Sequence, residues 1–173
     1  MLAVDEISLY LQATTMRVWA PVGQTPIVRI HTGRQKTNFY GCLNVHTGQE
    51  IVMEAEIMNA VTTATYLEKV ADAIPDKPIL LLWDRAPWHR GPAIRDFLTA
   101  NPRFELLWLP PGAPDLNPQE QVWKRTREHI SHNHVQTQMR DLAKAFADYL
   151  SNSVFKSAFL ERYGYSANCS FFN

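Results

Sequence analysis

The chain has 173 residues, of which 46% are hydrophobic and 20% charged, and its formal net charge is zero at pH 7. This composition excludes a disordered chain, and the length predicts one domain with a proper core rather than two. A protein that binds nucleic acid through charge alone is usually strongly basic, so any DNA contact must be local or shared with another segment.

The first half of the chain predicts strands joined by short turns. Turn-forming residues divide it into predicted strands at residues 1–12, 27–31, 37–45 and 50–56. Such short connections favour an antiparallel arrangement. Residues 62–73 then carry apolar side chains at helical spacing, and Pro75 ends this predicted helix.

The second half alternates helix and strand. The apolar run Ile79–Trp83 predicts a strand that is buried on both faces, and Phe104–Leu109 predicts another. Helices are predicted around residues 93–98, from about Pro118 and from about Thr137. The order of the main elements, β-β-β-α-β-α-β-α-α, fits one mixed-sheet α/β domain with helices on both faces.

Three features of the sequence predict a cytoplasmic protein without a membrane partner. No apolar run approaches the ~20 residues that span a bilayer, and Asp5-Glu6 follows the first four residues, where a signal peptide would be apolar. Cys42 and Cys169 lie far apart and have no metal-ligand spacing, which favours a reducing compartment.

Asp84 and Glu120 are the first candidate site residues, and 35 residues lie between them. Asp84 follows the apolar strand 79–83, at the strand end where α/β proteins usually bind ligands. Alternatively, it caps the next turn or pairs with Arg85 or Arg90. A carboxylate at a strand end and another at a helix start suit a divalent-metal site that acts on phosphodiesters.

Glu120 also has a purely structural explanation. Asn117 is a favoured N-cap and Pro118 suits the first helical position, so Glu120 stands at the third. In this alternative, a capping box, the Glu120 carboxylate accepts a hydrogen bond from the Asn117 amide, which contributes about 1 kcal/mol.

The remaining candidates are weaker as single residues. Asp5 and Glu6 are neighbours on a predicted strand and point to opposite faces, so one can lie beside Asp84 while the other is solvated. Periodicity does not decide which. His89 suits a turn or a satisfied polar position, and Trp123 suits the core.

The sequence Leu-Pro-Pro-Gly-Ala-Pro-Asp-Leu-Asn-Pro-Gln-Glu-Gln-Val-Trp at 109–123 resembles the segment with the last acid in transposases of the mariner superfamily and related bacterial insertion sequences. Residues 83–89, Trp-Asp-Arg-Ala-Pro-Trp-His, are similar to the segment with the second acid, and Asp5-Glu6 to the pair that opens the catalytic domain. Two positions depart from the family pattern. Arg85 replaces a common asparagine, and Pro-Pro-Gly-Ala-Pro replaces the frequent Pro-Pro-Tyr-Ser-Pro.

The resemblance implies a ribonuclease H-like α/β fold, a mixed five-stranded sheet with helices on both faces. It implies that Asp5, Asp84 and Glu120 are the catalytic residues and hold two Mg²⁺ ions, for which Mn²⁺ would substitute. The implied activity is DNA cleavage and strand transfer during transposition of an insertion sequence. The implied partners are transposon ends and target DNA, and the active complex is expected to be a homodimer.

Basic side chains near these acids predict phosphate contacts. The predicted DNA-binding residues, with His89, are Arg85, Lys124, Arg125, Arg127, Arg34 and Lys36. We expect residues 1–173 to form one catalytic domain without the N-terminal helix-turn-helix domain of the family, because the chain starts close to Asp5. Two alternatives stay open: another ribonuclease H-like nuclease, or a non-catalytic domesticated remnant that serves as a DNA-binding or oligomerisation module.

Overall fold

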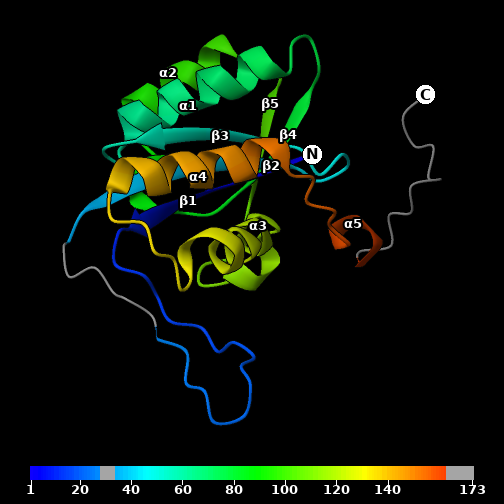
Figure 1. The fold of residues 1–173 in the computed structure, drawn as a ribbon. Helices are drawn as coiled ribbons and strands as arrows, with labels where there is room; N and C mark the ends of the chain where they lie inside the picture. Colours follow the sequence, from blue (N-terminus) through cyan, green and yellow to red (C-terminus); the bar gives the residue numbers. More distant parts are fainter. Residues whose placement is uncertain (28–33, 163–173) are drawn as a thin grey trace.

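A computed structural model describes residues 1–27 and 34–162, whose centre is a mixed five-stranded sheet (Figure 1). The order across the sheet is β3-β2-β1-β4-β5. The strands are β1 (Leu2–Tyr10), β2 (Lys36–Asn44), β3 (Glu50–Ala55), β4 (Ile79–Trp83) and β5 (Phe104–Trp108). The first three strands are antiparallel neighbours, whereas β4 is parallel to both β1 and β5. The expected antiparallel arrangement of the first half is confirmed.

Helices cover both faces of the sheet, as predicted. On one face lie α1 (Ala60–Ala73) and α2 (Pro92–Ala100), and the other carries α3 (Gln119–Thr126) and α4 (Met139–Asn152) (Figure 1). A one-turn helix, α5 (Phe159–Arg162), follows α4. Three-residue 3₁₀ turns at Pro87–His89 and Pro114–Leu116 follow β4 and β5, and a π-helical turn at Arg127–Ser131 extends α3.

The central strand β1 separates two hydrophobic cores. Leu2 and Val4 pack with the residues of α1 and α2, whereas Ala3 and Ile7 pack with those of α3 and α4. This alternation follows from the two-residue period of a strand. It also fixes the directions of the polar residues in the same strand, so Asp5 belongs to the α3 face.

Two predictions for the strands require correction or fall outside the described ranges. The strand at 104–109 was expected to be buried on both faces, but β5 is an edge strand, and Leu107 is 47% exposed. Most of the predicted strand at 27–31 lies outside the described residues. Within the described ranges, none of the helices has the length and apolar character needed to cross a membrane.

Candidate active site

Asp5 lies in the middle of β1, and its side chain is held from α3. Its direct partner on β2 is Gly41, where a Cβ would lie 2.4 Å from the ring of Trp123. Because Gly41 leaves this space free, the indole packs against the sheet and donates its Nε1–H to Asp5 Oδ2 at 3.1 Å. Burial, followed by repulsion from Glu6 and Glu120, raises the pKa of Asp5 from 3.8 to about 7.

Glu6 points to the opposite face of the sheet, which resolves the choice that periodicity left open. Its side chain is only 2% exposed. The carboxylate accepts hydrogen bonds from His89 Nε2 at 3.0 Å and from Trp88 Nε1 at 2.9 Å. Glu6 is therefore a buried support for His89, and Asp5 is the member of the pair that faces the candidate site.

Asp84 follows β4, where the chain turns sharply. Its Oδ1 accepts a hydrogen bond from the amide of Ala86 at 3.0 Å and lies 2.7 Å from His89 Nδ1. The hydrogen bond from His89 is the main reason that the pKa of Asp84 is lowered. Asp84 is thus a half-exposed carboxylate whose orientation is fixed by the Ala86 amide and the His89 ring.

His89 is buried and connects Asp84 of the candidate site with Glu6 on the opposite face of the sheet. Its ring stacks on Trp83, with ring centroids 4.1 Å apart, and its side chain is fully buried between Asp84 and Glu6. Burial alone would lower the pKa of His89, but the hydrogen bonds to Asp84 and Glu6 raise it to about 9. We therefore assign a proton to each ring nitrogen at neutral pH, so that the imidazolium donates to both carboxylates.

Glu120 lies in the first turn of α3, but the capping box considered above is not formed. The Asn117 amide donates instead to the Pro114 carbonyl at 2.8 Å. The Asn117 side chain accepts from the Gln119 amide at 3.1 Å and donates to the Val4 carbonyl at 3.1 Å. Asn117 therefore ties the start of α3 to β1 beside Asp5, and the Glu120 carboxylate is left to face the cavity.

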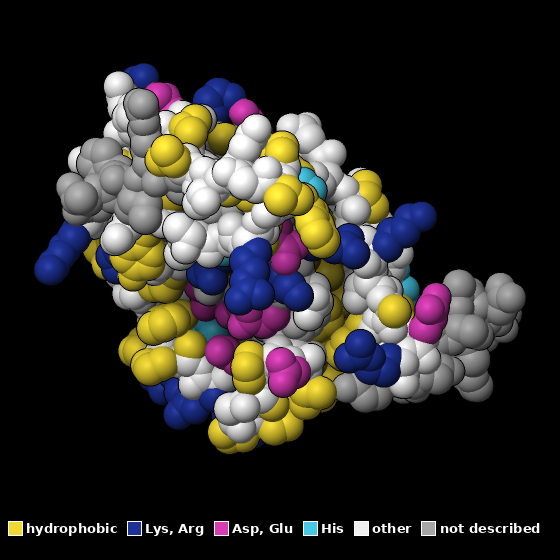
Figure 2. Space-filling view, turned by 60° about the horizontal axis from the view of Figure 1, so that its bottom comes forward, with side chains coloured by type: hydrophobic (Ala, Val, Ile, Leu, Met, Phe, Trp, Pro, Cys, Tyr) yellow, Lys and Arg dark blue, Asp and Glu magenta, His cyan; other side chains and the backbone are white. Residues whose placement is uncertain are grey.

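Asp5, Asp84 and Glu120 line one cavity of about 340 Å³. The other lining residues are Arg85, Ala86, Leu109, Pro110, Pro111, Gly112, Ala113, Pro114 and Asn117. Figure 2 shows acidic side chains gathered near the middle of one face of the molecule, among basic ones. Three segments that are distant in the sequence thus bring carboxylates to a single opening.

The chemistry of these donors fits a divalent cation. Burial first, and then repulsion from neighbouring carboxylates, raises the pKa of both Asp5 and Glu120, although Arg127 partly offsets the shift at Glu120. A hard divalent cation with oxygen ligands would relieve this repulsion. In the described part of the chain, no three carboxylate, imidazole or thiol side chains are already grouped as metal ligands. The three carboxylates therefore line the same cavity, but they are not close enough together to surround a single metal position.

The sequence model of the DDE superfamily endonuclease family matches residues 1–142. The chain belongs to this family. Residues 1–142 include β1, β4 and the first turn of α3, so the match covers all three acids of the cavity. This membership agrees with the family resemblance noted in the sequence.

Two bacterial proteins are similar to this chain in sequence. An uncharacterized 39 kDa protein of the insertion element IS630 from Shigella sonnei is 24% identical over 149 residues, which cover 84% of this chain and 43% of that protein. The uncharacterized protein y4pE/y4sA of Sinorhizobium fredii is 34% identical over 56 residues, which cover 32% of this chain and 38% of that protein. The chain thus spans less than half the length of these relatives.

Solved structures of the Mos1 mariner transposase share the fold. A paired-end complex with the left transposon end matches with a TM-score of 0.70 at 18% identity, over 94% of this chain and 53% of that one. The Mos1 catalytic domain matches with a TM-score of 0.62 at 16% identity, over 88% of this chain and 70% of that one. The expected ribonuclease H-like fold is confirmed by this likeness.

The residues predicted to bind DNA differ in their positions and exposure. Arg85 lines the carboxylate cavity, where its Nε donates to the Leu109 carbonyl at 3.3 Å. His89 is only 1% exposed and both ring nitrogens are engaged, so its surroundings contradict a role in DNA contact. The other predicted residues are exposed: Lys124 and Arg125 on α3, Arg127 just after it, Lys36 at the first position of β2 and Arg34 two residues before it.

The sequence alone does not identify several residues that support the candidate site. Gly41 is a glycine inside a strand, a pattern that signals close approach of another group, here Trp123. Asn117 was recognised only as a cap, because its bond to Val4 spans distant segments. The hydrogen bond that Gln119 Nε2 donates to Glu50 Oε1 at 2.7 Å could not be predicted from a local sequence pattern, because the two residues lie far apart in the sequence.

Proposed function

We propose that this chain supplies the catalytic domain of an insertion-sequence transposase, which cuts DNA and joins the freed 3′ ends to a target. The observation that carries the proposal is the single cavity lined by Asp5, Asp84 and Glu120. Membership of the DDE superfamily endonucleases supports it. So do the similarity to an insertion-element protein and the shared fold with a transposase bound to transposon ends.

Asp5, Asp84 and Glu120 would hold two Mg²⁺ or Mn²⁺ ions, as the carboxylate donors and their mutual repulsion favour. Mos1 structures with Mg and with Mn support the use of either metal. When bound, these ions supply an activated water or 3′-hydroxyl and neutralise charge at the leaving oxygen. The partners proposed are the two transposon ends and the target DNA, with a homodimer as the active complex.

The chain's own residues orient the carboxylates and the DNA. Trp123 directs Asp5 through its indole N–H, and His89 directs Asp84. Asn117 holds the first turn of α3 against β1, which fixes the base of Glu120. The Arg85 guanidinium, at the wall of the same cavity, would bind a DNA phosphate next to the cleaved bond.

The test is a comparison of Glu120→Gln with Glu68→Gln, which removes an exposed carboxylate on α1. Both variants and the unaltered chain would be assayed for cleavage of DNA carrying the element's ends and for Mn²⁺ binding by electron paramagnetic resonance. We expect Glu120→Gln to abolish cleavage and weaken Mn²⁺ binding, and Glu68→Gln to change neither. Cleavage by Glu120→Gln would show that the third ligand is misassigned. An unaltered chain without Mn²⁺ binding would favour the non-catalytic remnant.

A further inference from the structure

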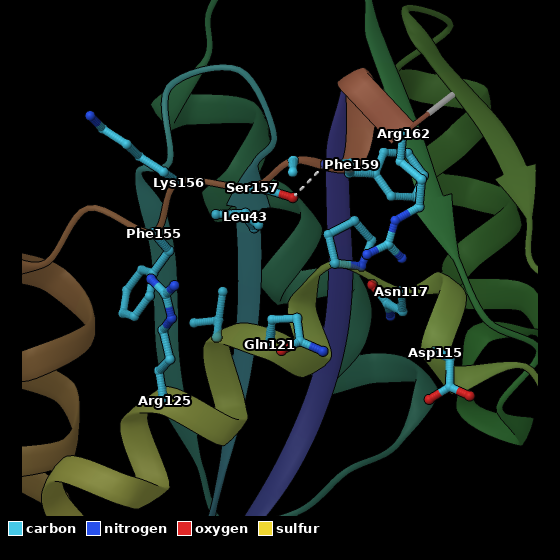
Figure 3. A pocket seen from close by; sticks show the side chains of 13 residues that line it. Leu43, Asp115, Asn117, Gln121, Arg125, Phe155, Lys156, Ser157, Phe159 and Arg162 are labelled. Atoms are coloured by element: carbon cyan, nitrogen blue, oxygen red, sulfur yellow. Dashed lines mark hydrogen bonds between the residues drawn. The ribbon is translucent and has the colours of Figure 1, made fainter. Parts of the chain in front are cut away.

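A second cavity, of about 260 Å³, lies between α3 and residues 155–162 (Figure 3). It is lined by Leu43, Asp115, Asn117, Pro118, Gln121, Val122, Arg125, Phe155, Lys156, Ser157, Ala158, Phe159 and Arg162. Three of these residues are basic and one is acidic, although the net charge of the whole chain is zero. The cavity therefore concentrates positive charge that the composition does not reveal.

The wall formed by residues 155–162 is fixed by the fold. The Phe155 amide donates to the Gly48 carbonyl at 2.7 Å in the turn between β2 and β3. Gly48 has a positive φ of 75°, and a Cβ there would lie 2.9 Å from the Phe155 backbone. Ser157 Oγ accepts from the Phe159 amide at 3.2 Å at the start of α5. These contacts hold this wall of the cavity in place.

Two arginines reach into the cavity from different elements. In Figure 3, Arg125 extends from α3 and Arg162 from α5, with the amide of Gln121 between them, whereas Lys156 points away. Among residues 1–27 and 34–162, neither guanidinium takes part in an ion pair with an acid. A planar guanidinium donates two parallel hydrogen bonds to phosphate, so two of them on opposite walls suit one phosphate group.

The second cavity adjoins the first across the start of α3. Asn117 lines both cavities. Along the helix, Glu120 faces the carboxylate cavity, and its neighbour Gln121 faces the basic one. A DNA strand that leaves the carboxylate cavity over this end of α3 would next meet Arg125 and Arg162.

We propose that Arg125 and Arg162 bind a backbone phosphate of the DNA strand that flanks the cleaved bond. The proposal rests on the proposed function for the nature of the substrate, and it adds a binding site that involves α5. Arg125 is among the DNA-binding residues predicted from the sequence, whereas Arg162 is not, and the sequence did not indicate that the two share one cavity. The site recognises phosphate and not base sequence, so it would anchor DNA of any sequence.

The experiment measures DNA affinity of the double variant Arg125→Gln/Arg162→Gln by fluorescence anisotropy over a range of salt concentrations. The control Arg95→Gln removes an exposed arginine from α2, on the opposite face of the sheet. Circular dichroism checks that each variant is folded. We expect about tenfold weaker binding for the double variant and a salt dependence that is shallower by roughly 1–2 units.

An affinity and a salt slope equal to those of Arg95→Gln would overturn the proposal. Free inorganic phosphate is an alternative ligand for the same two arginines. Calorimetry with inorganic phosphate alone distinguishes it from a DNA phosphate. If the double variant lost phosphate binding but kept DNA affinity, the site would serve free phosphate, and the proposal would be wrong. If DNA binding depended on both arginines but no DNA were cut, the proposed function would fail and the phosphate site would stand. Absence of DNA binding by the unaltered chain would overturn both.

Discussion

His89 Nδ1 lies 2.7 Å from Asp84 Oδ1, although the imidazole is buried and the carboxylate is half exposed. The exposed acid is thus oriented by a group that solvent does not reach. Since the other ring nitrogen is held by a second buried carboxylate, the ring has little freedom to turn. The Asp84 carboxylate therefore faces the cavity in a fixed orientation, which is the property that a metal ligand needs.

Replacing His89 by glutamine should weaken metal binding at Asp84 and destabilise the fold. Loss of the buried charged contacts should lower the free energy of unfolding by about 1–3 kcal/mol. Mn²⁺ titration and urea denaturation measure the two effects. Trp88→Phe is the matched control, because it removes a hydrogen bond to Glu6 and leaves the contact with Asp84 intact. Equal Mn²⁺ affinities for the two variants would count against a positioning role for His89.

Gly41→Ala should disturb the site from the neighbouring strand. The added methyl group would lie 2.4 Å from the Trp123 ring and 2.5 Å from Glu50 Oε1, so the indole must shift away from Asp5. We expect a loss of roughly 1–3 kcal/mol in the free energy of unfolding from overpacking, together with lower cleavage. Gly112→Ala is the control, because a Cβ there meets no atom within 4 Å and only its φ of 69° is unfavourable. Equal denaturation midpoints for the two variants would contradict this explanation.

The protonation of Asp5 predicts a dependence of metal binding on pH. Its pKa of about 7 exceeds its ordinary value of 3.8, so the folded chain keeps a proton that the unfolded chain has released. Without metal, the contribution of Asp5 to stability should fall as pH rises from about 4 to 7. Mn²⁺ affinity should rise over the same range, because the proposed ligand is the deprotonated Asp5 carboxylate. Asp5→Asn should make both stability, measured by thermal unfolding, and Mn²⁺ affinity, measured by titration, less dependent on pH. If both pH profiles were unchanged, the raised pKa of Asp5 would be refuted.

Glu50 should behave as a neutral acid. Burial raises its pKa well above 4.5, and its Oε2 is a buried atom without a partner, as is Oε1 of Gln119. A proton on Glu50 Oε2 would let each group donate to the other. Since the raised pKa makes stability fall as pH rises above about 4.5, Glu50→Gln should be increasingly more stable than the unaltered chain towards pH 9. Denaturation at pH 5 and pH 9 tests this, and a constant difference would argue against it.

The sequence predicted the elements well because their signals are local. The apolar run at 79–83 and the helical periodicity of 62–73 both correspond to observed elements. The error at β5 arose because an apolar run does not show whether a strand lies at the centre or at the edge of a sheet. The direction of the Asp5 side chain could not be predicted either. Alternation along the strand puts Asp5 and Glu6 on opposite faces of the sheet, but it does not show which of the two lies on the face with the candidate site.

The supports of the candidate site were harder to predict because each joins segments far apart in the sequence. The contact between His89 and Glu6 and that between Trp123 and Asp5 exist only when β1 lies between β4 and β2. The capping box at Glu120 had a sound local basis, but the Asn117 amide binds Pro114 instead. Tertiary contacts thus decided what the local pattern left open.

The central position of β1 has a consequence for protein synthesis. The first acid leaves the ribosome before the other two, but its strand must pair with β4, and the third acid is synthesised only with α3. A nascent or prematurely terminated chain therefore holds at most two of the three carboxylates. The fold itself delays assembly of the three-carboxylate cavity until the segment through the first turn of α3 has been made.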